Sequence, residues 1–223
     1  MGKRCILLFV KYPEAGKVKT RLGVDIGMEE AAALYRQFAE DLLATVKKLH
    51  IPLIVCYSPK EKGIDCMKWL GAGPLYYAQS EGDLGTRLEN AFYYAYSKGY
   101  QDVMVLGSDA PDLPVELLQD AFDRLDHSEV VIGPATDGGY YLLAFNRSGF
   151  FLDVFSGIPW STDMVYVETW SKIRMAGKSC EVLEEWSDVD TTLDLEALWQ
   201  RNQETCFKDS QTISWLREKK MFE

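Results

Sequence analysis

The stretch VMVLGSDAPDLP, residues 103–114, decides how this chain folds. Its first four residues form an uninterrupted apolar run, which is typical of a central parallel strand covered on both faces, because an edge strand alternates polar and apolar side chains. A glycine and a proline then turn the run into a loop that carries Asp109 and Asp112. Ligands of open α/β sheets collect outside the carboxyl ends of the strands. The two carboxylates are therefore placed where they can hold a divalent metal ion.

The same loop also has a purely structural interpretation. Pro114 followed by residues 115–125 has the pattern of a helix start, and aspartates close to such a start commonly cap the helix. This stretch alone leaves the metal site and the helix cap as open alternatives.

Strands and helices alternate along the rest of the chain. Apolar runs predict strands at residues 5–10, 53–57, 75–78, 103–106, 129–133, 140–145 and 178–183. Periodic patterns predict helices at 28–49, 60–70, 84–98, 114–125 and 161–175, the last capped by Ser161, and a helical region from about 191 to 223. Asp137-Gly138-Gly139 joins two strands directly, so the sheet is expected to be mixed. The alternation predicts an α/β fold with a mixed, mostly parallel sheet flanked by helices, in one domain over residues 1–223.

Composition narrows the class of protein. The net charge of −10 disfavours a nucleic-acid or anionic-membrane surface, since binding to a phosphate backbone needs a basic face. No apolar segment is long enough to span a bilayer. The apolar run at residues 5–10 is too short for a signal-peptide core, so a cytoplasmic location is expected. The five cysteines are dispersed and never form a Cys-x-x-Cys pair, which indicates reduced thiols.

Basic residues gather in the loop after the first predicted strand. Residues 11–22 contain Lys11, Lys17, Lys19 and Arg21, together with a proline and a glycine that turn the chain. In an acidic protein, four cations at the carboxyl end of a strand indicate an electropositive pocket for phosphates. A solvated loop that is simply basic is the alternative. The next helix is expected only after this loop.

Several common kinds of catalytic machinery are missing from the sequence. The two histidines, His50 and His127, both follow predicted helix ends, so a histidine triad or a histidine metal cluster is not expected. There is no Gly-x-x-x-x-Gly-Lys-Ser/Thr loop, and no Gly-x-Gly-x-x-Gly follows the first strand. The remaining candidates for catalytic and ligand-binding groups are therefore the carboxylates and the basic loop.

Carboxylates follow three of the predicted strands. They are Asp109 with Asp112, then Asp137, and then Asp188 with Asp190. In a doubly wound sheet these segments converge on one rim opposite the basic loop, and that arrangement suits a metal-bound polyphosphate. Mg²⁺ or Mn²⁺ typically takes one or two protein carboxylates and completes its shell with water and substrate phosphates. A divalent cation is therefore the expected cofactor.

Four segments of the chain together resemble one protein family. They are KYPEAGKVKTRL at 11–22, GSDAP at 107–111, DGGY at 137–140 and DVDT at 188–191. In this order they are similar to the motifs of the nucleotide-diphospho-sugar transferase superfamily, and in particular to bacterial glycosyltransferase-like proteins associated with radical-SAM genes, sometimes labelled arsenosugar-biosynthesis glycosyltransferases. The resemblance implies the GT-A fold, a nucleotide-binding α/β sandwich with a mixed central sheet. It also implies a divalent metal at the aspartate after the central strand.

The resemblance implies a role for individual residues of the phosphate and metal sites. By position, Lys19 and Arg21 would contact the diphosphate, and Lys11 would assist them. Asp109 would be the first metal ligand. Asp190, in an Asp-x-Asp-Thr segment before a helix, resembles the second ligand.

The nucleotide side of the site is also implied by the resemblance. Gly85 and Arg87, in the segment GDLGTRL at 82–88, are similar to residues near the nucleotide base and ribose. The sequence departs from the superfamily pattern at residues 12–16, where Tyr-Pro-Glu-Ala-Gly replaces a doubled glycine. That doubled glycine usually opens the loop that cradles an attacked triphosphate.

These expectations define a leading function and two alternatives. The leading function is metal-dependent transfer from a nucleotide-diphosphate sugar to a small-molecule acceptor, with Asp109 holding the metal and Asp137 acting as a base near the acceptor. Asp137 also suits a plain turn residue before the two glycines. The alternatives are a nucleotidyltransferase that joins a nucleoside triphosphate to a phosphorylated acceptor, and a non-catalytic nucleotide-binding protein. Asp112 is expected to be a loop or capping residue, with the second metal ligand far along the chain.

Overall fold

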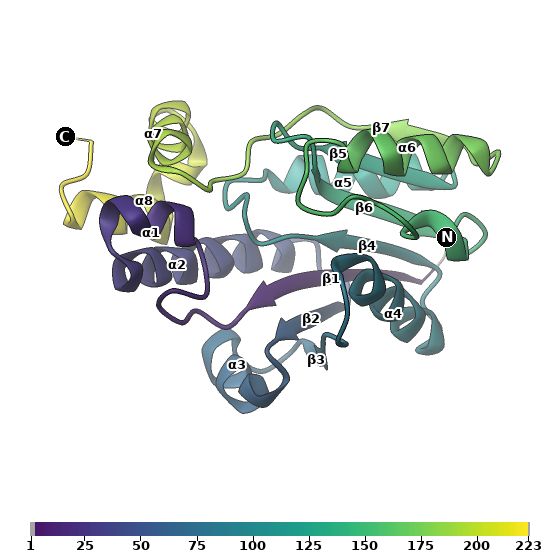
Figure 1. Ribbon diagram of the computed structural model, residues 1–223, viewed down its shortest axis with the longest axis horizontal. Helices are drawn as coiled ribbons and strands as arrows, with labels where there is room; N and C mark the ends of the chain where they lie inside the picture. The colour runs from purple at the N-terminus through teal and green to yellow at the C-terminus, as the bar shows by residue number, and fades with distance from the viewer. Residues whose placement is uncertain (1–2, 223) are drawn as a thin grey trace.

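The structure, a computed structural model, describes residues 3–222 (Figure 1). Met1 and Gly2, before the first predicted strand, and Glu223, at the end of the predicted helical region, lie outside the described residues. The described strands form one seven-stranded sheet in the order β3-β2-β1-β4-β6-β5-β7. Their bounds are β1 Arg4–Lys11, β2 Leu53–Ser58, β3 Leu75–Ala78, β4 Asp102–Leu106, β5 Val130–Pro134, β6 Tyr140–Asn146 and β7 Cys180–Val182.

Strand β4 is the central strand that its apolar run predicts. Residues 103–106 are at most 4% exposed. The strand pairs in parallel with β1 and antiparallel with β6. Strand β6 is also antiparallel to β5, whereas the other strand pairs are parallel. Among the described strands β6 alone runs against the rest, so the others end at one edge of the sheet. The predicted α/β fold with a mixed, mostly parallel sheet is confirmed.

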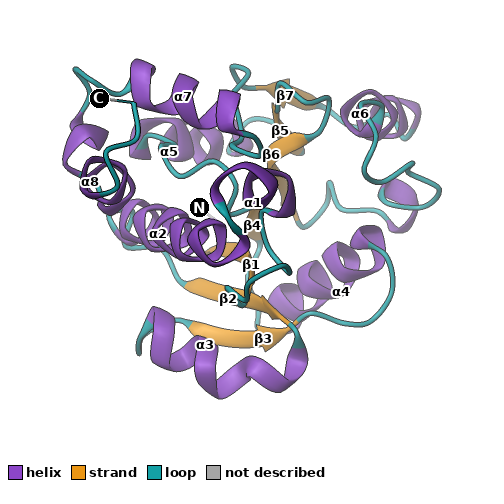
Figure 2. Cartoon of the chain, turned by 60° about the vertical axis from the view of Figure 1, so that its left-hand side comes forward, coloured by secondary structure: helices purple, strands orange, loops and turns teal. Residues whose placement is uncertain are grey.

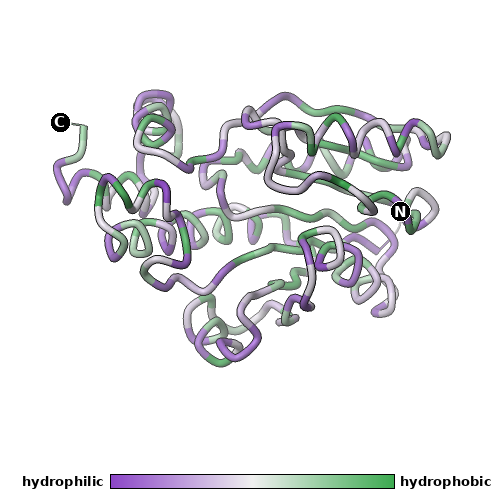
Figure 3. Tube along the Cα trace, in the orientation of Figure 1, coloured by the Kyte–Doolittle hydropathy of each residue, from purple (hydrophilic) through white to green (hydrophobic). Residues whose placement is uncertain are grey.

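Helices cover both faces of this sheet (Figure 2). On one face, α2 and α5 pack on the strands through residues such as Leu42 and Phe122. On the other face, α4 and α6 pack through residues such as Phe92 and Ile173. Hydrophobic residues follow the strands, as the trace in Figure 3 shows. The helix bounds are α1 Thr20–Ile26, α2 Met28–Lys47, η1 Lys60–Lys62, α3 Gly63–Leu70, α4 Leu84–Ser97, α5 Val115–Leu125, η2 Leu152–Val154, α6 Val165–Met175, α7 Thr192–Arg201, η3 Cys206–Asp209 and α8 Gln211–Glu218.

A separate hydrophobic cluster lies beyond the carboxyl edge of the sheet. It joins α1, the first half of α2, α7 and α8 through Leu22, Phe38, Val189, Leu195 and Ile213, all of which are buried. Figure 1 shows these helices gathered beyond the end of the sheet to which the arrowhead of β1 points. Because α1 follows the basic loop and α7 follows the segment with Asp188 and Asp190, this helical cluster fixes both segments beside the ends of the strands.

Helix α1 was not predicted from the sequence, and the expectation of a loop over residues 11–22 is wrong at its end. The helix is short, and Gly27 separates it from α2 with a φ of 94°. Its stability comes mainly from tertiary packing of Leu22 rather than from local preference, because so short a helix is unstable alone. Arg21 therefore lies in the first turn of a helix.

Two other predicted helices differ from the structure by more than one turn. Ser161 is not an N-cap: it has a φ of 66°, and α6 begins at Val165. The loop before α6 packs instead on the turn after β5, with the backbone of Asp163 against Gly138, and within α6 the amide of Tyr166 donates to the carbonyl of Gly138 at 2.8 Å. The C-terminal region is not continuously helical, because α7 ends at Arg201 and α8 starts only after its cap, Ser210. Across residues 3–222, no helix has both the length and the apolar composition needed to cross a membrane.

Candidate functional site

Lys19 is at the centre of the candidate site. Its ammonium Nζ lies 2.5 Å from Asp109 Oδ1 and 2.7 Å from Asp190 Oδ1. The lysine side chain is only 3% exposed. Burial would lower the pKa of Lys19, but the two adjacent carboxylates outweigh burial, so its pKa is raised above the usual value. The lysine therefore stays charged and holds together two aspartates that are 81 residues apart in the chain, at positions 109 and 190.

Asp109 is positioned by the residue before it. The hydroxyl of Ser108 hydrogen bonds to the hydroxyl of Tyr35 on α2 at 2.7 Å, and the Tyr35 oxygen accepts the backbone N–H of Lys11 at 2.9 Å. Complete burial, followed by the charge of Asp109, raises the pKa of Tyr35 to about 12. Tyr35 therefore remains protonated at neutral pH and ties the end of β1 to the loop after β4.

Asp190 is positioned by the start of α7. Asp194 accepts the backbone N–H groups of Asp190 and Thr191, and Thr191 in turn accepts the N–H of Asp194, which completes a capping box. The backbone N–H of Val189 donates to the carbonyl oxygen of Asp109 at 2.9 Å. The segment before α7 and the loop after β4 are therefore joined through the main chain as well as through Lys19.

Asp137 and Asp188 lie on the same rim. Beyond β5 and β7, the two chain segments form one more parallel bridge, in which the N–H of Thr136 donates to the carbonyl of Trp186 at 3.1 Å. Asp137 and Asp188 follow this bridge directly, one on each segment. Burial raises the pKa of Asp188 to about 6, and the carboxylates of Asp137, Asp190 and Asp109 add to the shift, while Lys19 opposes it. Asp137 Oδ1 accepts the N–H of Gly139 at 2.8 Å, so it is a turn residue, as one of its two interpretations predicts.

The remaining basic residues of the loop differ in their placement. Arg21 lies 3.8 Å from Asp190 Oδ2, and its side chain is 72% exposed, so it stands at the entrance of the site. Lys11 is the exposed last residue of β1, and Lys17 is also exposed. The structure thus brings Lys19, Arg21, Asp109 and Asp190 into one cluster. Lys11 is connected to this cluster only indirectly, because its backbone N–H donates to the Tyr35 hydroxyl, which in turn hydrogen bonds to Ser108.

Asp112 has a structural role that the sequence did not predict. It lies in a loop, as predicted, but it caps no helix, because α5 has Pro114 at its N-cap. Its side chain is 1% exposed and accepts hydrogen bonds from Nε and Nη2 of Arg201, Nδ2 of Asn202 and Nε1 of Trp186, at 2.7 to 3.1 Å. We call these four residues the Asp112 clamp. The clamp fixes the loop after β4 to the end of α7, and no local pattern signals it, because its donors lie 74 to 90 residues away.

Gly85 and Arg87 lie at the start of α4, away from the Lys19 cluster in the described contacts. A side chain at Gly85 would come within 3.0 Å of the Trp160 ring and within 2.9 Å of the Phe155 carbonyl, so this glycine lets the loop before α6 pack on α4. The Nε of Arg87 donates to the carbonyl of Gly82 at 3.0 Å. Gln79 secures the preceding loop, because its side-chain amide donates to the carbonyls of Val10 and Cys56.

The donor set of the Lys19 cluster suits a hard divalent cation. Oxygens of Asp109 and Asp190 converge on one cationic centre, the Lys19 ammonium, and the two carboxylate side chains are 52% and 38% exposed. Residues 3–222 contain no group of three or more His, Cys, Asp or Glu residues arranged to hold a metal. Mg²⁺ is commonly bound through one or two carboxylates plus waters and substrate phosphates, so this partial, solvent-open set is an appropriate one.

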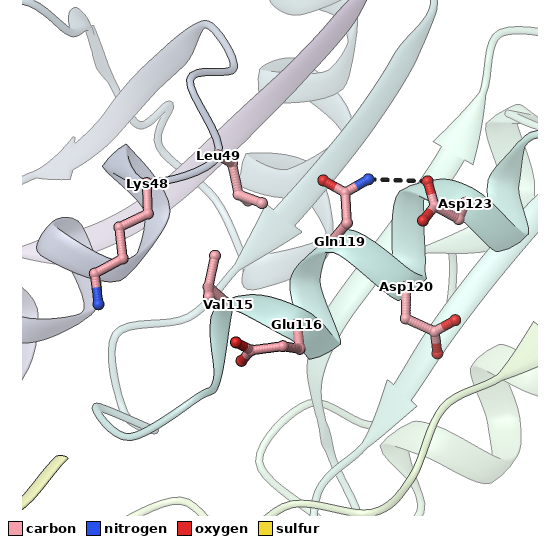
Figure 4. Close-up of a pocket in the computed structure, with 7 residues that line it drawn as sticks. All are labelled: Lys48, Leu49, Val115, Glu116, Gln119, Asp120 and Asp123. Atoms are coloured by element: carbon pink, nitrogen blue, oxygen red, sulfur yellow. Dashed lines mark hydrogen bonds between the residues drawn. The ribbon is translucent and has the colours of Figure 1, made fainter. Parts of the chain in front are cut away.

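A surface hollow of about 460 Å³ lies elsewhere, between the end of α2 and the start of α5 (Figure 4). It is lined by Lys48, Leu49, Val115, Glu116, Gln119, Asp120 and Asp123. None of the residues of the Lys19 cluster lines it, and a phosphate ligand would meet more acidic than basic side chains there. We therefore assign the hollow no part in the site.

Comparisons with known proteins identify the family and the fold. The profile of a family described as "Uncharacterized protein conserved in bacteria (DUF2064)" matches residues 42–162. A solved structure from Desulfovibrio desulfuricans G20, provisionally named a nucleotide-diphospho-sugar transferase, is 44% identical in sequence. It is similar over 99% of this chain and 96% of that chain, with a TM-score of 0.95. No curated protein matches the chain.

More distant structures share the fold. The 4-diphosphocytidyl-2C-methyl-D-erythritol synthase of Anaerococcus prevotii DSM 20548 is 13% identical, with a TM-score of 0.57 over 87% of this chain and 95% of that chain. Rv0371C of Mycobacterium tuberculosis H37Rv, solved in complex with manganese, is 16% identical, with a TM-score of 0.54 over 90% of this chain and 99% of that chain. At such identities the likeness concerns the fold alone.

Proposed function

This chain belongs to the DUF2064 family and to the nucleotide-diphospho-sugar transferase superfamily, and from that premise we propose that it is a metal-dependent transferase with a nucleotide-diphosphate sugar as donor. The superfamily recognised in the sequence is confirmed by the relative that is 44% identical. The observation that supports the proposal best is the convergence of Lys19, Arg21, Asp109 and Asp190 at the carboxyl edge of the sheet. Such an edge is where α/β sheets bind ligands.

The proposed roles follow from charge. Lys19 and Arg21 bind the diphosphate and stabilise the negative charge that develops on it as it departs, with Lys11 assisting from the end of β1. Asp109 and Asp190 hold the cation. A bound Mg²⁺ or Mn²⁺ supplies further neutralisation of the leaving diphosphate.

Asp137 is the proposed base. An acceptor hydroxyl loses its proton to the Asp137 carboxylate while its oxygen forms a bond to the sugar carbon. The bond from that carbon to the diphosphate oxygen breaks, and its electron pair leaves with the nucleoside diphosphate. The hydrogen bond from the Gly139 N–H to Asp137 Oδ1 supports this role by orienting the carboxylate on the rim that also carries Asp188.

The loop after β1 offers only part of its backbone to a phosphate ligand. A loop that cradles an attacked triphosphate needs free backbone N–H groups. Here the N–H of Tyr12 donates to Ser58, that of Glu14 to Tyr12 and that of Lys17 to Glu14, each to a backbone carbonyl at 2.7 to 3.0 Å. Those three amides are already used within the protein, whereas no hydrogen bond is described for the N–H groups of residues 15, 16, 18 and 19. A departing diphosphate, in contrast, can be neutralised by the side chains of Lys19 and Arg21.

The nucleoside is proposed to bind toward the start of α4. That helix follows β3, so it begins at the same edge of the sheet as the Lys19 cluster. Gln79 holds the connecting loop on the ends of β1 and β2. This proposal assigns the surroundings of the base and ribose to Gly85 and Arg87.

The proposal is tested by incubating the protein with a panel of nucleotide sugars and, separately, with a panel of nucleoside triphosphates and sugar phosphates, each with Mg²⁺ or Mn²⁺. Release of a nucleoside diphosphate is expected, and it should require the cation. Pyrophosphate release without nucleoside diphosphate would instead identify a nucleotidyltransferase. Binding of nucleotides without either product would indicate a binding protein. The Asp109→Asn variant serves as the control for background hydrolysis.

A further inference from the structure

One feature of the Lys19 cluster goes beyond a generic diphosphate site: the ammonium occupies the position between the two carboxylates. Its contacts with Asp109 and Asp190 are 2.5 and 2.7 Å. A hard cation binds carboxylate oxygens at about 2.0 to 2.6 Å. The ammonium and a divalent cation therefore compete for the same place.

The backbone at Lys19 is held in a conformation that serves this contact. Lys19 has φ and ψ of 44°, in the left-handed region, immediately before α1. A residue other than glycine adopts this region only when its surroundings compensate for the strain. The two ion pairs of Lys19 provide that compensation, and the Phe38 ring, with its centre 6.0 Å from Nζ, covers the ammonium from the side of α2.

We propose that Lys19 is an exchangeable internal counterion: it neutralises Asp109 and Asp190 in the metal-free protein, and a divalent cation that binds this pair displaces its ammonium toward the donor diphosphate. This inference rests on the proposed function and specifies how the site is regulated. The displaced ammonium needs a new anionic partner, because a buried cation without one is unfavourable. The diphosphate is that partner, so cation and nucleotide bind cooperatively, and the cation alone binds weakly.

Arg21 provides a matched comparison for this role. It carries the same charge and faces the same Asp190, but at 3.8 Å and with a side chain that is 72% exposed. Solvent screens such a pair strongly. Neutralising Arg21 therefore changes the net charge of the site as much as neutralising Lys19 does, without vacating the position between the carboxylates.

The first test measures Mn²⁺ affinity without nucleotide, by electron paramagnetic resonance of free Mn²⁺ and by calorimetry. Lys19→Met is expected to bind Mn²⁺ about tenfold more tightly than the parent, because the competing ammonium is removed. Arg21→Met should stay within about threefold of the parent. In the parent alone, addition of ADP, CDP, GDP or UDP should raise the Mn²⁺ affinity, after correction for Mn²⁺ bound by the free nucleotide. Equal Mn²⁺ affinities for Lys19→Met and the parent would overturn the inference.

The second test uses the unmodified protein, so it does not depend on the folding of a variant. Lysines are acetylated briefly with and without Mg²⁺, and each site is quantified by mass spectrometry. The buried, ion-paired Lys19 should react slowly without Mg²⁺ and several times faster with Mg²⁺, whereas Lys17, exposed on the same loop, should not change. An unchanged rate at Lys19 under conditions where Mn²⁺ or Mg²⁺ binds would contradict the exchange.

The two proposals fail in different ways. If neither the parent nor Lys19→Met binds Mn²⁺, with or without any of the four nucleoside diphosphates, the metal site of the proposed function is wrong and the exchange falls with it. If the parent binds Mn²⁺ and releases nucleoside diphosphate, but Lys19 neither competes with Mn²⁺ nor becomes reactive, only the exchange is wrong.

Discussion

Asp109 and Asp112 lie in the same loop, but their carboxylates have opposite environments. Asp112, in the Asp112 clamp, is 1% exposed and is saturated by Arg201, Asn202 and Trp186. Asp109, three residues earlier, is 52% exposed and has the single ammonium of Lys19 as its charged partner. The Asp112 carboxylate accepts four hydrogen bonds within the protein, so it has no capacity left for a ligand and stabilises the fold. The Lys19 cluster keeps capacity for a ligand, and that difference separates a structural ion pair from a candidate functional one.

The largest expected effect comes from breaking the clamp. Asp112→Ala leaves the donors of Arg201 and Asn202 without their acceptor, so the free energy of unfolding should fall by about 3 to 5 kcal/mol. Urea denaturation measures it. The matched control is Asp120→Ala, which removes an exposed aspartate paired with Arg124 and should cost no more than about 0.5 kcal/mol. Similar losses for the two variants would show that the clamp is not a buried ion-pair network.

The complementary change is Asp109→Asn in the Lys19 cluster. Turnover of the donor should fall about 100-fold, since a ligand of the charge-stabilising cation is lost. The free energy of unfolding should fall by only about 1 kcal/mol, because the carboxylate is half exposed and Lys19 keeps its ion pair with Asp190. Steady-state assays and urea denaturation on the same preparation give both values. If Asp109→Asn unfolds as readily as Asp112→Ala, or keeps full turnover, the assignment of a functional role to Asp109 and a structural role to Asp112 is wrong.

A smaller effect is expected at Tyr35, which links the end of β1 to the loop that carries Asp109. Tyr35→Phe removes the hydroxyl that links the N–H of Lys11 to Ser108, which should cost about 1 kcal/mol of stability. Because Ser108 precedes Asp109, the KM for the donor should also rise a few-fold. Tyr93→Phe, at an exposed tyrosine of α4, is the control and should change neither quantity. A stability loss with no change in KM would limit Tyr35 to a structural role.

The smallest effect is expected at the entrance of the site. Arg21→Gln should raise the KM for the donor less than about tenfold and leave stability unchanged, because the exposed guanidinium is screened by solvent and salt. The difference from the parent should shrink as ionic strength rises, which initial-rate measurements at low and high salt can follow. Lys17→Gln, on the same loop, controls for charge alone. An effect of Arg21→Gln that does not depend on salt would indicate a direct, buried contact instead.

Much of the fold was predictable because its signals are local. The apolar run of β4 predicted a central strand, and residues 103–106 are buried between β1 and β6. The periodic pattern over residues 84–98 predicted α4, and Asp83 caps its start by accepting the N–H of Thr86. Helix α1 and the start of α6 were missed, because both depend on packing: α1 on the cluster of α2, α7 and α8, and the loop around Ser161 on Gly138.

The sequence by itself determined the alternation of strands and helices, and it determined that cations follow β1 and that carboxylates follow β4, β5 and β7. Periodicity and residue order are enough for that, since strand ends share an edge in a parallel sheet. Only the tertiary structure decided that Asp112 is enclosed by Arg201 and Asn202, and that Lys19 lies between Asp109 and Asp190. Burial and pairing of a charge are set by partners far along the chain, and the residues beside an aspartate carry no information about them.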